Sequence, residues 1–153
     1  MILEAGNQAP DFELQDNQGD VRKLSDYAGQ TVVVYFYPKD DTPGCTKEAC
    51  SFRDSYQNFK TAGVEVIGIS PDSVKSHSKF SEKHDLPFTL LSDPEHKVCE
   101  AYGVWGLKKF MGREYDGVFR TTFVIGPDGK IKKVFKNVKP ADHSHEVLEA
   151  VKA

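Results

Sequence analysis

Hydrophobic positions along this chain form two kinds of pattern, continuous runs and runs with helical spacing. The continuous runs, at 31–37, 64–69 and 88–91, are rich in β-branched and aromatic residues. Such runs are typical of strands that are buried on both faces of a sheet. The helical patterns predict helices over 43–62, 73–84, 94–102 and 142–151. Strands that alternate with helices in this way favour an α/β fold.

Two hairpins complete the predicted elements. The turn 17–20 separates two short alternating runs and predicts an N-terminal β-hairpin. The turn 126–129 joins the apolar segments 120–125 and 130–135, and this second hairpin would give the sheet an antiparallel edge. We therefore expect a thioredoxin-like α/β sandwich with a central mixed sheet and helices on both faces.

A flavodoxin-like sandwich would have a similar order of elements. That alternative is weakened because no Gly-rich or Ser/Thr-rich phosphate-binding loop follows the first buried strand. The chain of 153 residues is long enough for one domain with its own hydrophobic core. We therefore expect residues 1–153 to form a single domain.

Composition and charge narrow the class of protein. The net charge of −3 gives no sign of the basic surface that nucleic-acid-binding domains use. No apolar run is long enough to span a membrane, and the N-terminal residues lack the parts of a signal peptide. Three cysteines, an odd and low number, indicate reduced thiols rather than a secreted disulfide scaffold. We expect a cytoplasmic protein without nucleic-acid or membrane partners.

The segment 35–50 contains two of the three cysteines and is the most informative part of the chain. An apolar strand leads through a polar loop into a helix, for which Thr42 is a good N-cap and Pro43 a good first residue. Cys45 therefore falls in the first helical turn, where unpaired N–H groups and the helix dipole stabilise a thiolate. The loop itself supplies no clear cation, so a distant arginine is needed to complete the site.

The segment Pro38-Lys39-Asp40-Asp41-Thr42-Pro43-Gly44-Cys45 has the spacing Pro-x-x-x-Thr-x-x-Cys and resembles the active-site motif of the peroxiredoxin family. With Cys50 and the segment Arg120-Thr121-Thr122-Phe123-Val124-Ile125, the chain is similar to the bacterioferritin-comigratory, or Q-type, branch of that family. The resemblance covers nearly the whole chain, including the opening Gly6-x-x-Ala9-Pro10-Asp11-Phe12 and the segment Phe88-Thr89-Leu90-Leu91-Ser92-Asp93.

The resemblance implies a role for each residue of the motif. Cys45 would be the peroxidatic cysteine and Cys50 the resolving cysteine. The Thr42 hydroxyl would hydrogen-bond the thiolate and orient the peroxide, and Pro38 would shield the pocket from water. Arg120 would stabilise the thiolate and polarise the peroxide, a task that suits the fixed charge and several donors of a guanidinium.

Gly44 would complete the substrate-binding site with Thr42 and Arg120, because its backbone can approach a substrate closely. No metal ion, flavin or haem is implied, so we expect no cofactor. The five histidines also lack the spacing of a metal-ligand set with the cysteines.

The implied activity is that of a thiol-dependent peroxidase in antioxidant defence, an atypical 2-Cys peroxiredoxin. Cys45 would reduce hydrogen peroxide or an alkyl hydroperoxide and become a sulfenic acid. Cys50 would condense with it to an intramolecular disulfide, which thioredoxin or a similar dithiol would reduce. The resemblance also favours a monomer.

The pairing of Cys45 with Cys50 makes a geometric demand on the helix. The Cα atoms of residues five apart in an α-helix are roughly 8.6 Å apart, beyond the ~7 Å limit for a disulfide. The helix would therefore have to unwind locally in each cycle. Cys99 lies in an ordinary helical pattern and is expected to be structural.

Three other classes of protein could use this fold or these cysteines. A thiol–disulfide oxidoreductase would normally carry Cys-x-x-Cys, which is absent from this sequence. A redox sensor or chaperone-like binding protein could use the same thiols without turnover. A flavin-binding electron carrier would be yellow as purified.

Overall fold

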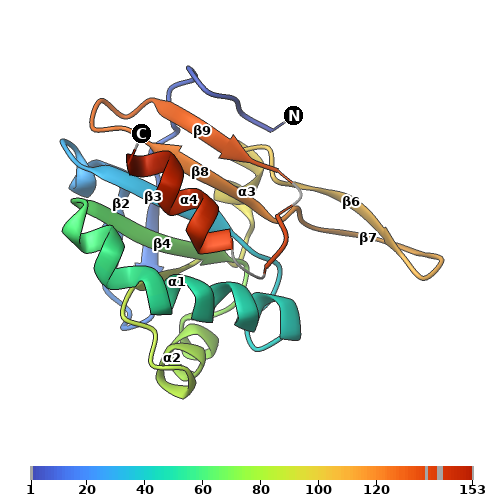
Figure 1. Ribbon diagram of the computed structural model, residues 1–153. Helices are drawn as coiled ribbons and strands as arrows, with labels where there is room; N and C mark the ends of the chain where they lie inside the picture. The colour runs from blue at the N-terminus through green and yellow to red at the C-terminus, as the bar shows by residue number, and fades with distance from the viewer. Residues whose placement is uncertain (1, 137, 141–142, 153) are drawn as a thin grey trace.

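The computed structural model describes residues 2–136, 138–140 and 143–152. Within these residues a seven-stranded sheet has the order β2-β1-β5-β4-β3-β8-β9, and β6 and β7 form a separate hairpin (Figure 1). The strands are β1 (Glu13–Asp16), β2 (Val21–Lys23), β3 (Thr31–Phe36), β4 (Val64–Ser70), β5 (Thr89–Ser92), β6 (Trp105–Phe110), β7 (Arg113–Val118), β8 (Thr121–Ile125) and β9 (Ile131–Phe135). The helices are η1 (Leu24–Tyr27), α1 (Pro43–Thr61), α2 (Val74–Lys83), α3 (Lys97–Ala101) and α4 (His143–Lys152).

The seven-stranded sheet is mixed, as the sequence predicts. The central strands β3, β4 and β5 are parallel, whereas β8 and β9 form an antiparallel hairpin beside β3. The N-terminal hairpin of β1 and β2 lies at the other edge. The thioredoxin-like sandwich and both predicted hairpins are therefore confirmed.

Helices cover both faces of this sheet, because the side chains of β3 alternate between two buried clusters. Val33 and Tyr35 pack in one cluster with side chains of α1, α2 and α4. Val34 and Phe36 pack in the other, with side chains of α3 and the N-terminal segment. In Figure 1, α1 and α4 lie on the near face of the sheet and α3 lies behind it.

The topology brings several loops to one end of the sheet. Because β3, β4 and β5 are parallel, the loops that follow them leave from the same end. β8 runs in the opposite direction, and its first residue, Thr121, pairs with Phe36 at the end of β3. The start of β8 therefore lies beside the start of α1. In open α/β sheets, ligands bind outside the carboxyl ends of the strands.

The hairpin of β6 and β7 is absent from the sequence prediction, and it projects away from the sheet (Figure 1). Its turn contains Met111 and Gly112, both with positive φ, 51° and 77°. Asn-Gly or Asp-Gly is the usual signal for such a turn, and methionine gives none. Leu107, Met111 and Tyr115 are also exposed, so its strands lack the alternation of a half-buried sheet.

Two other elements differ in length from the prediction. The helix expected over 94–102 is confined to α3, because His96 at its N-cap has a left-handed φ of 50°. The closing helix, α4, begins at His143, and the expected first residue, Asp142, lies outside the described residues. Within the described ranges, none of the helices is both long and apolar enough to cross a membrane.

Candidate active site

The sulfur of Cys45 lies against the guanidinium of Arg120. Arg120 Nη2 donates a hydrogen bond to Cys45 Sγ at 3.3 Å. Cys45 is the third residue of α1 and is only 1% exposed. Arg120 comes directly before β8, whose antiparallel pairing with β3 returns it to the end of the sheet where α1 begins. The topology thus supplies the distant arginine that the sequence requires.

A second contact fixes the orientation of Arg120. Its Nη1 atom donates to Oε1 of Glu48 at 2.7 Å, and the Glu48 side chain is fully buried. Burial raises the pKa of Glu48 to about 7, although the charge of Arg120 acts in the other direction. The second oxygen, Oε2, is buried without a hydrogen-bond partner among the described residues. That oxygen is the one on which a proton would lie near neutral pH.

Arg120 remains charged in this setting. Burial acts to lower the pKa of Arg120, but the negative charges of Glu48 and Cys45 and its hydrogen bonds to them outweigh burial and raise it. A permanent positive charge in contact with a sulfur stabilises the thiolate, which is the nucleophilic form of cysteine. The arrangement is therefore suited to attack by sulfur on an electrophile.

Thr42 occupies the N-cap position of α1, as predicted, and its carbonyl accepts the Thr46 N–H at 2.8 Å. Its hydroxyl does not cap the helix; it donates to the Lys39 carbonyl at 2.8 Å. Among the described residues, no hydrogen bond joins this hydroxyl to Cys45. Because its one proton is used, the hydroxyl offers only lone pairs to a ligand.

Gly44 and Pro38 flank this arrangement in the sequence. A Cβ atom on Gly44 would lie 3.2 Å from Arg120 Nη2 and 3.5 Å from Pro140 Cγ. Such a contact is tight, so the absence of a side chain lets the arginine approach the helix. Pro38 is half-buried in the loop between β3 and α1.

The other two cysteines lie in different surroundings, and all three are free thiols. Cys50 is half-buried on the same unbroken helix as Cys45, and it lines a surface groove with Ser144 and His145 of α4. Cys99 is fully buried in the cluster on the opposite face of the sheet from Cys45. Burial and then the charge of Asp93 raise the pKa of Cys99, which disfavours its thiolate.

Sequence reasoning missed Glu48 and Lys108. Glu48 follows Cys45 by three residues and precedes Phe52 by four, so helical spacing alone places it on the buried stripe of α1. Lys108 Nζ donates to the Val118 carbonyl at 2.9 Å. Burial and then the charge of Arg120 lower the pKa of Lys108. Lys108 belongs to the unpredicted hairpin, and no sequence signal would have indicated it.

Comparisons with known proteins agree with this geometry. Residues 5–134 match the model of the AhpC/TSA family. Peroxiredoxin Bcp of Bacillus subtilis is 53% identical over 152 residues, which cover 99% of this chain and 97% of that protein. Peroxiredoxin Bcp of Escherichia coli is 52% identical over 150 residues, which cover 98% and 96%.

A solved structure of the bacterioferritin comigratory protein of Xanthomonas campestris has the same fold, with a TM-score of 0.89 and 36% identity. The match covers 99% of this chain and 96% of that one. The Xanthomonas structure is one of a set of trapped intermediate and ligand complexes that address the alkyl peroxide reduction activity of that protein. The chain therefore belongs to the AhpC/TSA family, in the Bcp or peroxiredoxin Q branch, and it is a thiol-dependent peroxidase.

Proposed function

We propose that Cys45 is the peroxidatic cysteine of this peroxidase. The observation that carries the proposal is the 3.3 Å contact between its buried sulfur and Arg120, in the first turn of α1. A guanidinium and a helix N-terminus both favour a thiolate. Cys99 is as buried as Cys45, but burial and then the charge of Asp93 raise its pKa, which argues against that cysteine as the nucleophile.

In the first step, the Cys45 thiolate attacks one oxygen of hydrogen peroxide or an alkyl hydroperoxide. An S–O bond forms and the O–O bond breaks, so sulfur loses two electrons and becomes a sulfenic acid. The other oxygen leaves as hydroxide or alkoxide and takes up a proton. Arg120 stabilises both the attacking sulfur and the leaving oxygen, since its donors face the place where charge moves. The Xanthomonas relative supports alkyl hydroperoxides as substrates.

Three further residues would orient the peroxide. The Thr42 hydroxyl, which donates to Lys39, would accept the O–H of the incoming peroxide with a lone pair. Gly44 would leave room for the substrate beside Arg120. Pro38, which lies in the β3–α1 loop, would limit the access of water to the substrate pocket.

In the second step, Cys50 attacks the sulfenic sulfur, a disulfide forms, and the hydroxyl leaves as water. Cys50 is favoured over Cys99 because it shares α1 with Cys45, whereas Cys99 is buried across the sheet. The first turns of α1 must unwind for this step, since an intact helix holds the Cα atoms roughly 8.6 Å apart. Thioredoxin or a similar dithiol then reduces the exposed disulfide by thiol–disulfide exchange.

We also propose that the protein works as a single-domain monomer in the cytoplasm. The covering helices pack on one sheet that draws strands from residues 13–135, which supports a single domain. Light scattering of the reduced and oxidised protein measures its molar mass and so tests whether it is a monomer. A disulfide within one chain leaves this mass unchanged.

The experiment that tests the cysteine assignment uses one equivalent of peroxide and mass spectrometry. Cys50→Ser should react once and then stay as a sulfenic acid or overoxidise to a sulfinic acid, without turnover with thioredoxin. Cys99→Ser, the matched control, should form the Cys45–Cys50 disulfide as the wild type does. A disulfide in Cys50→Ser would identify Cys99 as the resolving cysteine and contradict the proposal.

A further inference from the structure

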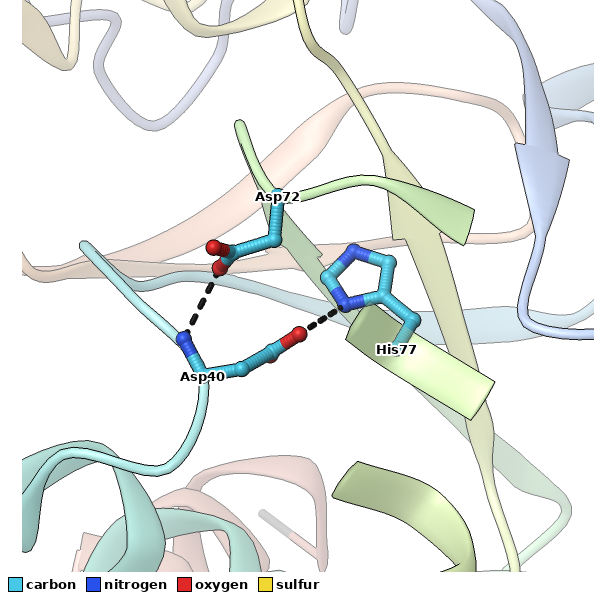
Figure 2. A group of neighbouring side chains, drawn as sticks. All are labelled: Asp40, Asp72 and His77. Carbon is cyan, nitrogen blue, oxygen red and sulfur yellow. Dashed lines mark hydrogen bonds and ion pairs between the residues drawn. The ribbon is translucent and has the colours of Figure 1, made fainter. Parts of the chain in front are cut away.

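A buried polar cluster outside the cysteine site joins the β3–α1 loop to helix α2 (Figure 2). Nδ1 of His77, a fully buried residue of α2, lies 2.7 Å from Asp40 Oδ2. The Asp40 N–H donates to Asp72 Oδ2 at 2.8 Å. The hydroxyls of Ser76 and Tyr37 donate to the two carboxylate oxygens of Asp40. Asp40 is thus held from four sides, and three of its hydrogen bonds are made by its side chain.

The geometry requires a proton between His77 and Asp40. Nε2 of His77 lies 2.9 Å from the carbonyl oxygen of Leu91, which can only accept, so Nε2 carries a hydrogen. Nδ1 faces a carboxylate oxygen, which also accepts when it is ionised. Either an imidazolium faces a carboxylate or a neutral imidazole faces a protonated carboxyl group. In both cases one proton joins Nδ1 to Oδ2.

Asp40, Asp72 and His77 also have the composition of a metal site. The distances favour a shared proton between His77 and Asp40 over a metal ion. Zinc bonds of about 2.0–2.1 Å would set two tetrahedral ligand atoms roughly 3.3 Å apart, whereas Nδ1 and Oδ2 are 2.7 Å apart. Oδ2 of Asp72 already accepts from the Asp40 N–H and from the Ser70 hydroxyl. The ligand atoms therefore satisfy one another without an ion.

The next residue of the loop is also tied to α2. Asp41 has a positive φ of 58°, which is uncommon for a residue other than glycine and strains the backbone of the loop. Its carboxylate pairs with Lys83 Nζ at 2.9 and 3.0 Å, but both side chains are exposed, and such pairs contribute little. The buried hydrogen bonds of Asp40, among them the contact with His77, therefore restrain this loop more than that exposed ion pair does.

We propose that His77 is a positioning residue for the peroxidase reaction and acts through Asp40. The inference rests on the proposed role of Cys45. Asp40 is two residues before the N-cap Thr42, whose hydroxyl is bound to Lys39, so the loop and the first turn of α1 move together. Arg120 lies outside both this loop and α1, directly before β8. The contact between His77 and Asp40 thus sets the position of the thiolate relative to Arg120.

The test compares four variants by stopped-flow oxidation of the reduced protein and by amide hydrogen exchange. His77→Leu should slow the reaction of Cys45 with hydrogen peroxide by about 10- to 100-fold, the size of effect expected when a reacting group is misplaced by about 1 Å. Exchange of the amides of residues 39–46 should accelerate in the same variant. Asp40→Asn should keep most of the rate, because its amide can donate to a neutral His77 Nδ1.

Leu86→Ala is the matched control for stability. Leu86 is a buried residue just beyond the C-terminal end of α2, and among the described residues its hydrogen bonds go to Ser81 and not to Asp40, Asp72 or His77. Its replacement should destabilise the protein while the peroxide rate and the exchange of residues 39–46 stay near wild type. If His77→Leu does not fold, Ser76→Ala serves instead, since it removes one donor to Asp40 and should slow the reaction by a smaller factor.

Two results would overturn the inference. One is a peroxide rate that falls no further in His77→Leu or Ser76→Ala than in Leu86→Ala. The other is a metal ion that the purified wild-type protein holds and that His77→Leu does not, since this result would place the ion in the cluster. A wild-type protein that does not react through Cys45 would instead contradict the proposed function, so the two failures are distinguishable.

Discussion

Cys45 and Cys99 occupy the same position in two helices, but the charges around them differ in sign. Each is the third residue of its helix, α1 or α3, and each is at most 1% exposed. The Arg120 guanidinium contacts the sulfur of Cys45. Beside Cys99 lies the carboxylate of Asp93, which accepts its backbone N–H at 2.9 Å. Burial near a helix start is therefore not enough to make a thiol reactive. The sign of the neighbouring charge determines whether the thiolate is stabilised.

The two helix starts also differ in their caps. Asp93 accepts the N–H groups of both Val98 and Cys99, so its carboxylate occupies the first turn of α3. In α1 the Thr42 hydroxyl turns to the Lys39 carbonyl, and among the described residues no side chain caps the first turn. The free N–H groups of α1 are therefore available to a thiolate or to a peroxide oxygen.

The largest expected effect is the contrast between serine substitutions at the two cysteines. Cys45→Ser should lower thioredoxin-coupled peroxide turnover by about 10³-fold or more, because a hydroxyl does not replace a thiolate nucleophile. Cys99→Ser should keep most of its turnover. The measurement is steady-state peroxide consumption. Equal losses in both variants would mean that the charge contrast does not determine reactivity.

Arg120→Ala should make Cys45 resemble Cys99 in reactivity. We expect the second-order rate constant with hydrogen peroxide to fall by about 10²- to 10³-fold, since a donor to both the thiolate and the leaving oxygen is lost. Ultraviolet absorbance measures the fraction of thiolate at each pH. Rates taken where the variant is fully ionised then isolate the part that acts on the leaving oxygen. Full recovery of the wild-type rate there would leave Arg120 with only an ionising role.

The buried elements of the fold could be predicted, because burial requires a recognisable pattern of hydrophobic residues in the sequence. The predicted strand 31–37 is β-branched or aromatic at every position, and its side chains enter two clusters on opposite faces of the sheet. The hairpin of β6 and β7 could not be predicted in this way, because it is largely exposed and turns at Met111. The spacing of hydrophobic residues indicates which faces of an element are buried. An exposed element has no such face, so its sequence gives little sign of it.

For the candidate site, the sequence indicated the positions close to Cys45, and the resemblance indicated Arg120. The cation had to come from a distant segment, and only the pairing of β8 with β3 explains why Arg120 is that cation. The hydrogen bond from Thr42 to Lys39 was not foreseen, because an N-cap hydroxyl usually turns toward the helix. Side-chain partners of this kind depend on loop geometry that no local pattern encodes.

Oxidation should loosen α1 and leave α3 unchanged. Cys45 and Cys50 cannot form a disulfide while α1 is intact, so the oxidised protein should lose the first turns of this helix. Amide exchange of residues 45–52 should therefore rise on oxidation, by about tenfold or more, as expected for local unfolding. Exchange of β4 and of the amides near Cys99 provides the internal control. Equal protection of α1 in both redox states would argue against Cys50 as the partner.

The smallest expected effect concerns Glu48, the acid beside Cys45, as Asp93 is the acid beside Cys99. Burial raises the pKa of Glu48 from 4.5 to about 7. Between these two pH values the folded protein holds a proton that the unfolded chain has lost. The contribution of Glu48 to stability therefore falls as pH rises through this window, in total by on the order of 3 kcal/mol.

Glu48→Gln keeps the shape of the side chain and removes its titration, so this part of the pH dependence should disappear. Urea unfolding at several pH values between 4.5 and 8, on wild type and variant, measures the difference. Glu82→Gln is the matched control, because Glu82 is exposed on α2 and its side chain makes no ion pair or hydrogen bond among the described residues. If the stabilities of wild type and Glu48→Gln change alike with pH through this window, Glu48 does not titrate there and Arg120 keeps it ionised. The pair would then act as a fixed ion pair, and the positive field at Cys45 would be partly cancelled at every pH.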